Sequence, residues 1–352
     1  MANFDEMSFA VNELSGGKNV VIMDDLGLPS IYVVIPKGNN GNVISGGSAS
    51  VVHPAFIVDG VEKGCFYYSK YQNVVFNNRA YSLSRRDPAV SMNHDTAKKY
   101  CTNKGKGFHL STMAEWAYLA LWSRKNGTMP HGNSNYGCDE AYGFERGVET
   151  CKDSGKTARC LTGSGPVTWA HDHTNAGIMD MKGNVWEWQD GLRLNNGEIN
   201  IVANNNAALG EDCDTSANST LWKAIMPDGS LVAPGTTGTL KYSQSGNSIV
   251  TSNSAATGGG SGGFADMGLG SGVSIPEIAK ALILYPDEPK GDYAGDYHWW
   301  NIEGERLPIC GGSWHNGALA GVFNLNLFNP RSIAAWHIGF RSALPSSQML
   351  QT

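Results

Sequence analysis

The sequence predicts a loop-rich α+β fold. Helix signals lie in residues 93–105 and 112–127. Residues 323–328 (FNLNLF) have apolar side chains at the odd positions and Asn, Asn and Phe at the even ones, the period of two expected of a half-buried strand. The 44 glycines and the abundant asparagines favour turns and left-handed backbone positions. We therefore expect short helices and strands connected by long loops.

Composition and charge disfavour several classes of partner. At 352 residues, with 41% hydrophobic side chains, the chain can bury the core of one large or two ordinary domains. The net charge is −6 and no basic cluster exceeds residues 84–86, so neither nucleic acid nor an anionic membrane is expected as a partner. No window approaches the roughly 18 apolar residues of a membrane span, and residues 1–20 lack the apolar core of a secretory signal. We expect a protein made in the cytoplasm without a signal peptide and without membrane insertion.

The cysteines indicate free thiols. There are seven, an odd number, and none forms a CxxC pair. Because no export signal accompanies them, buried free thiols are favoured over a disulfide framework.

The first 70 residues divide into two parts near position 50. Residues 1–50 show no persistent helical period and end in Gly/Asn/Ser-rich sequence, which predicts an irregular N-terminal arm. Their β-prone runs at 20–23 and 31–35 leave open a small β subdomain or a subunit contact. Residues 55–60 and 65–71 are strand-like runs joined by a Gly-containing turn, which predicts a hairpin.

Two short helices are predicted next. Asn93 can cap a helix that ends near Gly105. Thr112 and Glu115 have the spacing of a capping box, in which each side chain satisfies a free backbone N–H of the other residue. Trp116, Leu119 and Ala120 would form the buried stripe of this second helix.

Three motifs in fixed order carry a family resemblance. Residues 107–120 read GFHLSTMAEWAYLA and residues 177–188 read GIMDMKGNVWEW. Later come GGSW at 311–314 and IGFR at 338–341, two stretches that we call the frame. The motifs resemble those of formylglycine-generating (sulfatase-modifying) domains, a branch of the C-type lectin fold. The resemblance implies an α+β, C-type lectin-like domain over residues 51–352.

One long stretch exceeds what the compact family domain needs. Residues 196–308 are rich in Gly, Ser and Asn, as in the run GGGSGG at 258–263, and such sequence is compatible with long loops. We interpret residues 196–308 as an insertion that supports the surface of the domain. Residues 275–284 within it could form one short helix.

Between and beside the two parts of the frame lie six residues that follow no core pattern, namely His315, Leu319, Ile333, Ala335, Trp336 and His337, together with the strand-like run 323–328. The period of two places Asn324, Asn326 and Phe328 on one strand face and the two leucines on the other. An aromatic side chain on a polar face suggests a contact, because aromatic residues are favoured anchors of binding surfaces. Residues 311–341, which we call the variable segment, resemble the variable region of proteins diversified by retroelements. In those proteins adenine-directed mutagenesis changes surface residues of a fixed lectin fold.

This resemblance implies a non-enzymatic ligand- or receptor-binding protein of the phage-tail type, associated with the virion. Its partner would be a protein or glycan on a cell surface, and some members of the family form homo-oligomers, namely trimers. The positions expected to bind the ligand are His315, Leu319, Asn324, Asn326, Phe328, Ile333, Ala335, Trp336 and His337.

The resemblance also points to a structural calcium site. Asp180, Gly183, Val185 and Glu187 match the positions of the family's second calcium site, which uses two side chains and two backbone carbonyls. Hard oxygen ligands on a tight turn suit Ca²⁺. The residues leave a second interpretation open, in which Asp180 and Glu187 pin the turn by accepting backbone N–H groups. No other cofactor is expected.

The alternative function is a formylglycine-generating oxidoreductase or a degenerate relative. In that family the reaction runs through a reactive cysteine pair, with copper in aerobic enzymes, in the segment after GGSW. Residues 315–322 (HNGALAGV) contain no thiol, and Cys310 precedes the motif. A nucleophilic or soft-metal site cannot be built from those residue types, so we predict no catalytic residues.

Overall fold

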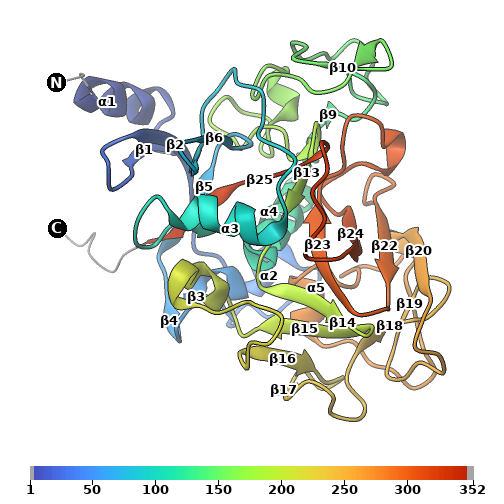
Figure 1. Cartoon of the computed structure of the whole chain (residues 1–352). Helices are drawn as coiled ribbons and strands as arrows, with labels where there is room; N and C mark the ends of the chain where they lie inside the picture. Colours follow the sequence, from blue (N-terminus) through green and yellow to red (C-terminus); the bar gives the residue numbers. More distant parts are fainter. Residues whose placement is uncertain (1–3, 347–352) are drawn as a thin grey trace.

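The computed structural model describes residues 4–346 and is organised around two large sheets, the first antiparallel and the second mixed (Figure 1). The first has five strands in the order β1-β2-β5-β26-β8. Its strands are β1 (Asn19–Met23), β2 (Pro29–Pro36), β5 (Cys65–Ser69), β26 (Ser342–Pro345) and β8 (His109–Leu110). Strand β26 lies between β5 and β8, so the sequence just after the frame is held inside this sheet.

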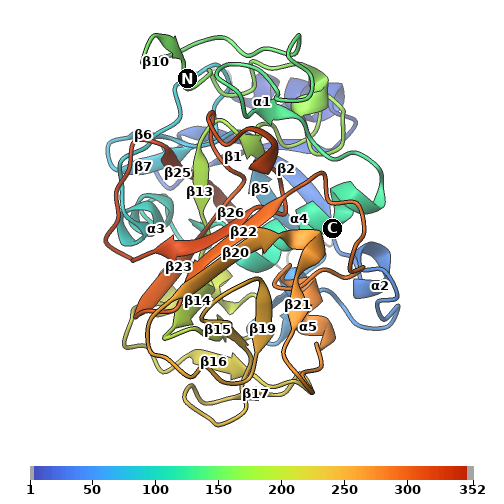
Figure 2. The ribbon, with the colours of Figure 1, turned by 90° about the vertical axis from the view of Figure 1, so that its right-hand side faces the viewer.

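The second sheet has thirteen strands, and its orange strands cross the middle of the view in Figure 2. Its main path is β20 (Gly259–Gly263), β22 (Tyr297–Asn301), β24 (Leu325–Asn329), β23 (Glu305–Cys310), β14 (Leu192–Asn195), β15 (Glu198–Val202), β18 (Lys241–Tyr242), β19 (Ser248–Val250) and β21 (Gly268–Leu269). Off this path lie β13 (Trp186–Trp188), β25 (Ile338–Phe340), β16 (Trp222–Ile225) and β17 (Leu231–Val232).

Small hairpins and short helices complete the structure. The two-stranded sheets are β3 (Ile57–Val58) with β4 (Val61–Glu62), β6 (Val74–Phe76) with β7 (Arg79–Tyr81), β9 (Gly132–Asn133) with β12 (Lys182–Gly183), and β10 (Lys152–Asp153) with β11 (Lys156–Thr157). The α-helices are α1 (Phe4–Leu14), α2 (Asn40–Val43), α3 (His94–Thr102), α4 (Met113–Lys125) and α5 (Glu277–Ala281). The 3₁₀ helices are η1 (Pro54–Phe56), η2 (Val167–Trp169), η3 (Asn206–Asp212), η4 (Phe264–Asp266) and η5 (Gly317–Leu319). No helix within residues 4–346 is long and apolar enough to cross a membrane.

Helix α4 lies at the centre of the main core. Ten of its thirteen residues are buried, because α4 packs against side chains from both large sheets. Its core partners include Phe66 of β5, Leu194 of β14 and Leu325 of β24. The sequence predicted a buried stripe of Trp116, Leu119 and Ala120. All three are buried, but the buried part of α4 is wider than this stripe because both sheets cover the helix.

Both predicted helix starts are confirmed. The side-chain oxygen of Asn93 accepts a hydrogen bond from the Thr96 N–H at 2.9 Å. Thr112 Oγ1 accepts from the Glu115 N–H at 3.2 Å, and Glu115 Oε2 accepts from the Thr112 N–H at 3.1 Å, which is a complete capping box. Local signals of this kind need no distant partner.

Two N-terminal regions differ from the expectation. Residues 1–50 are more regular than expected, since they contain helix α1 and two strands that join the first sheet rather than forming a sheet of their own. The predicted hairpin of 55–60 with 65–71 is wrong. Strand β3 pairs with β4 around Asp59 and Gly60, which both have positive φ, and β5 pairs with β2 and β26. The turn at Asp59 and Gly60 therefore pairs β3 with residues 61–62, before the second predicted run at 65–71 begins.

Residues 196–308 share their core with the rest of the molecule. Ile199, Ile249, Phe264 and Trp300 belong to the same buried cluster as α4. The short helix predicted within 275–284 is present as α5. In Figure 1 this yellow-to-orange region lies at the end of the molecule opposite α1.

Candidate ligand-binding surface

One strand holds both ends of the variable segment. Strand β13 pairs antiparallel with β23, where Glu187 faces Cys310, and parallel with β25, where Trp188 faces Phe340. The frame therefore starts and ends beside the 177–188 motif. Both glycines of GGSW have positive φ, and a Cβ at Gly311 would lie 2.8 Å from the Met181 carbonyl oxygen. A side chain at Gly311 would be strained as well as crowded.

Arg341 fixes the second half of the frame. Its guanidinium is fully buried and donates to both carboxylate oxygens of Glu187, from Nε at 2.8 Å and from Nη2 at 3.0 Å. It also donates to the carbonyl oxygens of Ser69, Lys70 and Met179. The arginine thus ties the first sheet, the 177–188 motif and the frame together.

The predicted binding residues differ in exposure. Phe328 and Trp336 are 52% and 42% exposed, whereas the frame residue Trp314 is 0% exposed. The exposed predicted positions are His315, Leu319, Phe328, Ile333 and Trp336, and the half-buried ones are Asn326, Ala335 and His337.

The predicted exposure of Asn324 is wrong. This residue is 0% exposed and its side-chain amide donates to the Leu319 carbonyl oxygen. Strand β24 begins only at Leu325, and the Asn324 N–H closes a turn onto the Gly321 carbonyl at 3.0 Å. The period of two applies inside the paired strand, so it does not extend to the turn before it.

Three of the predicted residues gather around Trp314. Its ring centroid lies 4.7 Å from that of Trp336, 5.4 Å from His315 and 6.3 Å from His337. The Arg159 guanidinium stands 6.0 Å from the Trp336 ring centroid and donates to the Trp336 carbonyl at 3.2 Å. The exposed indole is therefore seated between a buried ring and a cation.

A second group of residues, which are half-buried, lies on β24 and the neighbouring β22. Asn326 is paired in register with Trp299 of the neighbouring β22, and the Trp299 ring centroid lies 4.7 Å from that of Tyr297. Trp299 also contacts Trp186, with ring centroids 6.0 Å apart. The backbone N–H of Trp186 donates to the His337 carbonyl oxygen at 2.9 Å. Trp186 thus connects the strand group to the group around Trp314.

Several residues of this surface were missed by the sequence reasoning. Arg159, Tyr297 and Trp299 come from elements far from the variable segment in sequence. Tyr136 was also missed; its N–H donates to the Trp314 carbonyl at 2.7 Å. A pattern in one sequence cannot indicate such pairings.

The two histidines of this surface are electrically neutral near pH 7. Burial lowers the pKa of both His315 and His337, and the charge of His315 lowers that of His337 further. Their ring centroids are 5.8 Å apart. Two neutral imidazoles can each donate and accept a hydrogen bond, which suits polar recognition.

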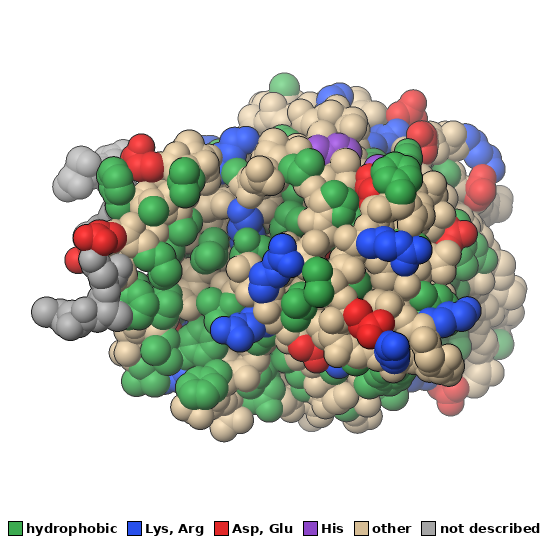
Figure 3. Space-filling view, turned by 90° about the horizontal axis from the view of Figure 1, so that it is seen from above, with side chains coloured by type: hydrophobic (Ala, Val, Ile, Leu, Met, Phe, Trp, Pro, Cys, Tyr) green, Lys and Arg blue, Asp and Glu red, His purple; other side chains and the backbone are tan. Residues whose placement is uncertain are grey.

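The charge of the outer surface is mixed. On the face seen from above in Figure 3, Lys and Arg side chains are interspersed with Asp, Glu and hydrophobic side chains. Such a distribution gives little attraction for a polyanion.

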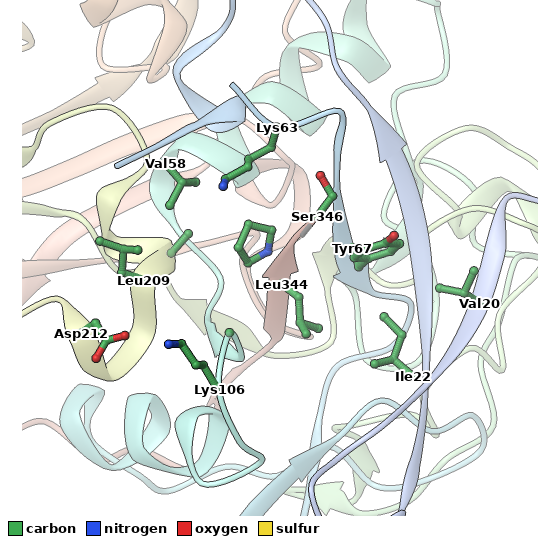
Figure 4. Close-up of a pocket in the computed structure, with 13 residues that line it drawn as sticks. Val20, Ile22, Val58, Lys63, Tyr67, Lys106, Leu209, Asp212, Leu344 and Ser346 are labelled. Atoms are coloured by element: carbon green, nitrogen blue, oxygen red, sulfur yellow. The ribbon is translucent and has the colours of Figure 1, made fainter. Parts of the chain in front are cut away.

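A separate cavity of about 560 Å³ lies beside the first sheet. Val20, Ile22, Tyr67 and Leu344 line it, with Lys106 among its polar residues (Figure 4). None of the predicted binding positions lines this cavity.

A buried carboxyl group supports the loop before β24. Asp296 Oδ2 accepts from the Phe323 N–H at 2.6 Å, while its Oδ1 has no hydrogen-bond partner among the described residues. Burial raises the pKa of Asp296 to about 7. Because its pKa is higher in the folded protein, folding favours the protonated Asp296 carboxyl group. The stability gained in this way is fully present below the pKa of Asp296 in the unfolded chain and is lost as the pH rises through about 7.

We expect Asp296→Asn to remove this pH dependence. The melting temperature of the variant relative to the wild type should rise between pH 5 and pH 8, because only the wild type must bury a charge at the higher pH. Thermal unfolding of both proteins across this range measures the difference. A constant difference would show that Asp296 does not titrate there. Groups common to both proteins cancel in the comparison.

Each of the four residues of the predicted calcium site places one oxygen near a side-chain nitrogen, although Asp180 does so through its backbone carbonyl rather than its carboxylate. Gln72 Nε2 lies 3.0 Å from Glu187 Oε1, and 3.2, 3.5 and 3.1 Å from the carbonyl oxygens of Asp180, Gly183 and Val185. Both Glu187 oxygens are also bound by Arg341. The carboxylate of Asp180 accepts from the Gly163 N–H at 2.7 Å. The groups present therefore do not fit Ca²⁺. The second interpretation holds for Asp180, which accepts a backbone N–H, whereas Glu187 accepts from the side chains of Gln72 and Arg341 instead.

All seven cysteines are free in this structure; five are buried, whereas Cys65 and Cys151 are half-buried. Cys310 is fully buried, and its Sγ lies 3.9 Å from Met113 Sδ. Burial raises the pKa of its thiol well above the usual range. Such a thiol is a poor nucleophile, because the reactive species is the thiolate.

Comparison with solved structures gives distant similarities. PvdO from Pseudomonas aeruginosa is 16% identical, with 93% of this chain and 98% of that chain covered and a TM-score of 0.40. Treponema denticola variable protein 1 is 13% identical, with 93% and 99% covered and a TM-score of 0.33. The Major Tropism Determinant U1 variant is 12% identical, with 93% and 71% covered and a TM-score of 0.33. Nothing about function follows from similarities at this level.

The family comparison is decisive for the fold. A search of curated proteins found no match to this chain. The family model for the sulfatase-modifying factor enzyme 1-like domain matches residues 53–228, which is half of the chain. The predicted fold of the formylglycine-generating type is thereby confirmed, and this chain belongs to the family of sulfatase-modifying factor enzyme 1-like domains.

Proposed function

We propose that this protein is a non-enzymatic binding protein whose variable segment recognises a protein or glycan on a cell surface. The observation that carries the proposal is the contrast within residues 311–341. The frame is buried: its second half pairs with β13 through β25, and GGSW directly follows β23, which pairs with the other side of β13. Phe328 and Trp336, by contrast, are exposed between the two halves. Exposed aromatic side chains on a rigid support are favourable anchors, because little conformational entropy is lost when they bind.

The placement of the exposed residues supports diversification. His315, Leu319 and Ile333 lie in or beside turns, with the fold held by the frame rather than by their own side chains. Substitutions at such positions change the surface and leave the core intact. We propose that a retroelement diversifies them and that the protein is a receptor-binding component of a phage tail, assembled as a homo-oligomer such as a trimer.

Genomic sequence tests the diversification directly. We expect a near-copy of the codons for residues 311–341 beside a reverse-transcriptase gene, with differences confined to adenines of that copy. Differences spread over all four bases, or no such copy in the genome, would contradict retroelement diversification.

The second candidate is a formylglycine-generating oxidoreductase, which the family membership favours. The residues of the variable segment argue against it. Residues 315–322 contain no thiol, and Cys310 is fully buried beside Met113. A cysteine pair that could bind copper or attack a substrate is not available in this segment.

We expect the purified protein neither to oxidise a sulfatase-type cysteine peptide nor to bind Cu(I) tightly. Mass spectrometry of the peptide after incubation with protein, copper and oxygen would detect the aldehyde. Cys310→Ser is the matched variant, since Cys310 directly precedes the GGSW motif. Turnover above a no-enzyme control would contradict the proposed function, and its loss in Cys310→Ser would assign the activity to that thiol.

A further inference from the structure

We infer that Gln72 is a built-in substitute for a metal ion at the turn of residues 180–187, so that this turn closes without calcium. Its Nε2 lies within 3.5 Å of three backbone carbonyl oxygens and one carboxylate oxygen. These oxygens come from the four residues whose positions match the family's calcium site. An amide NH₂ group carries two protons and partial positive charge, so it collects the oxygens that a cation would otherwise collect.

The orientation of the Gln72 amide is set by the side chain of Asn184. Gln72 Oε1 accepts from Asn184 Nδ2 at 2.8 Å, and that nitrogen also donates to the Cys160 carbonyl at 3.1 Å. The opposite orientation would place Oε1 against four oxygens and the NH₂ group against another NH₂ group. The hydrogen-bond network therefore assigns the nitrogen to the centre of the turn.

Charge also disfavours an ion at this turn. Glu187 and Arg341 form a fully buried pair, with both carboxylate oxygens held by the guanidinium. A divalent cation would add two positive charges beside a fully buried guanidinium. Calcium also takes six to eight oxygen ligands, and the Asp180 carboxylate is already bound by the Gly163 N–H.

The position of Gln72 gives the substitution a structural consequence. Gln72 follows β5 of the first sheet, and its four oxygen partners lie in the motif that leads into β13. Strand β13 holds both ends of the variable segment. The support of the binding surface therefore depends on Gln72 and not on the calcium concentration.

The test uses calcium alone as the probe and thermal unfolding as the readout. We expect the wild type to purify without stoichiometric calcium, and to melt at the same temperature in chelator and in millimolar calcium. Gln72→Ala should melt about 4 °C lower or more, because three buried carbonyl oxygens lose this donor and Glu187 Oε1 keeps only Arg341. Gln72→Glu should be less stable in chelator, and calcium should raise its melting temperature by about 2 °C or more by binding only the folded state.

Gln189→Glu is the matched control. Gln189 is also fully buried beside Glu187, but its Nε2 donates only to the Glu187 carbonyl, at 3.4 Å. Calcium should not raise the melting temperature of this control. The inference is overturned if the wild type holds one calcium and loses stability in chelator, or if Gln72→Ala melts like the wild type. An equal calcium response in both Glu variants, or none in Gln72→Glu, also counts against it. If Gln72→Glu does not fold, metal content and Gln72→Ala still decide.

Discussion

Arg341→Met is expected to lower the free energy of unfolding by about 3–5 kcal/mol. The replacement keeps much of the side-chain volume but leaves the Glu187 carboxylate buried without a counter-charge, at a position that is 1% exposed. It also leaves the carbonyl oxygens of Ser69, Lys70 and Met179 without this donor. Urea unfolding followed by tryptophan fluorescence measures the loss.

Two controls separate the buried charge from other causes. Arg331→Met removes a partly exposed guanidinium that pairs with Asp95 and Glu305, so it should cost only about 1 kcal/mol. Adding Glu187→Leu to Arg341→Met should recover part of the lost stability, because the unpaired charge disappears. If the double variant were less stable than Arg341→Met alone, the cost would not come from the orphaned carboxylate.

The sequence was informative wherever a structural signal is local. The capping box of Thr112 and Glu115 forms as predicted, and the helix signalled by Asn93 begins there. The order of the three motifs predicted the family, since each motif occupies a fixed place in the fold. The helix caps depend on neighbours within a few residues, and each motif is a continuous stretch of the chain. One sequence therefore contains both kinds of signal.

The contacts that the sequence did not predict are long-range. Gln72 lies 115 positions from Glu187, and Arg341 lies 154 positions from it. Neither pairing leaves a periodic trace, so the calcium interpretation could not be distinguished from hydrogen bonding before the fold was known. The same reason explains Asn324, because only the position of the turn before β24 decides which way its side chain points.

Phe328→Ala and Trp336→Ala should each weaken ligand binding by about 2 kcal/mol or more, roughly thirtyfold in affinity. Both side chains are exposed, and the proposed function makes them the aromatic anchors of the ligand. The probe is intact bacterial cells, chosen from a panel by their binding of the fluorescently labelled wild-type protein. Titration of labelled variants on the selected cells gives the affinities. Trp336→Ala should also cost about 1 kcal/mol of stability, since its ring packs on Trp314.

Substitutions in the frame should reduce the stability of the fold rather than remove a contact with the ligand. Trp314→Ala and Phe340→Ala should destabilise the fold by about 3–5 kcal/mol, because each removes a ring that is 0% exposed and leaves a cavity. Melting temperatures of all four variants, measured beside the cell titrations, separate loss of contact from loss of fold. If Phe328→Ala and Trp336→Ala unfold as readily as Trp314→Ala, their side chains belong to the core. The variable segment would then lose its two aromatic anchors, and the proposed binding surface would have to be abandoned.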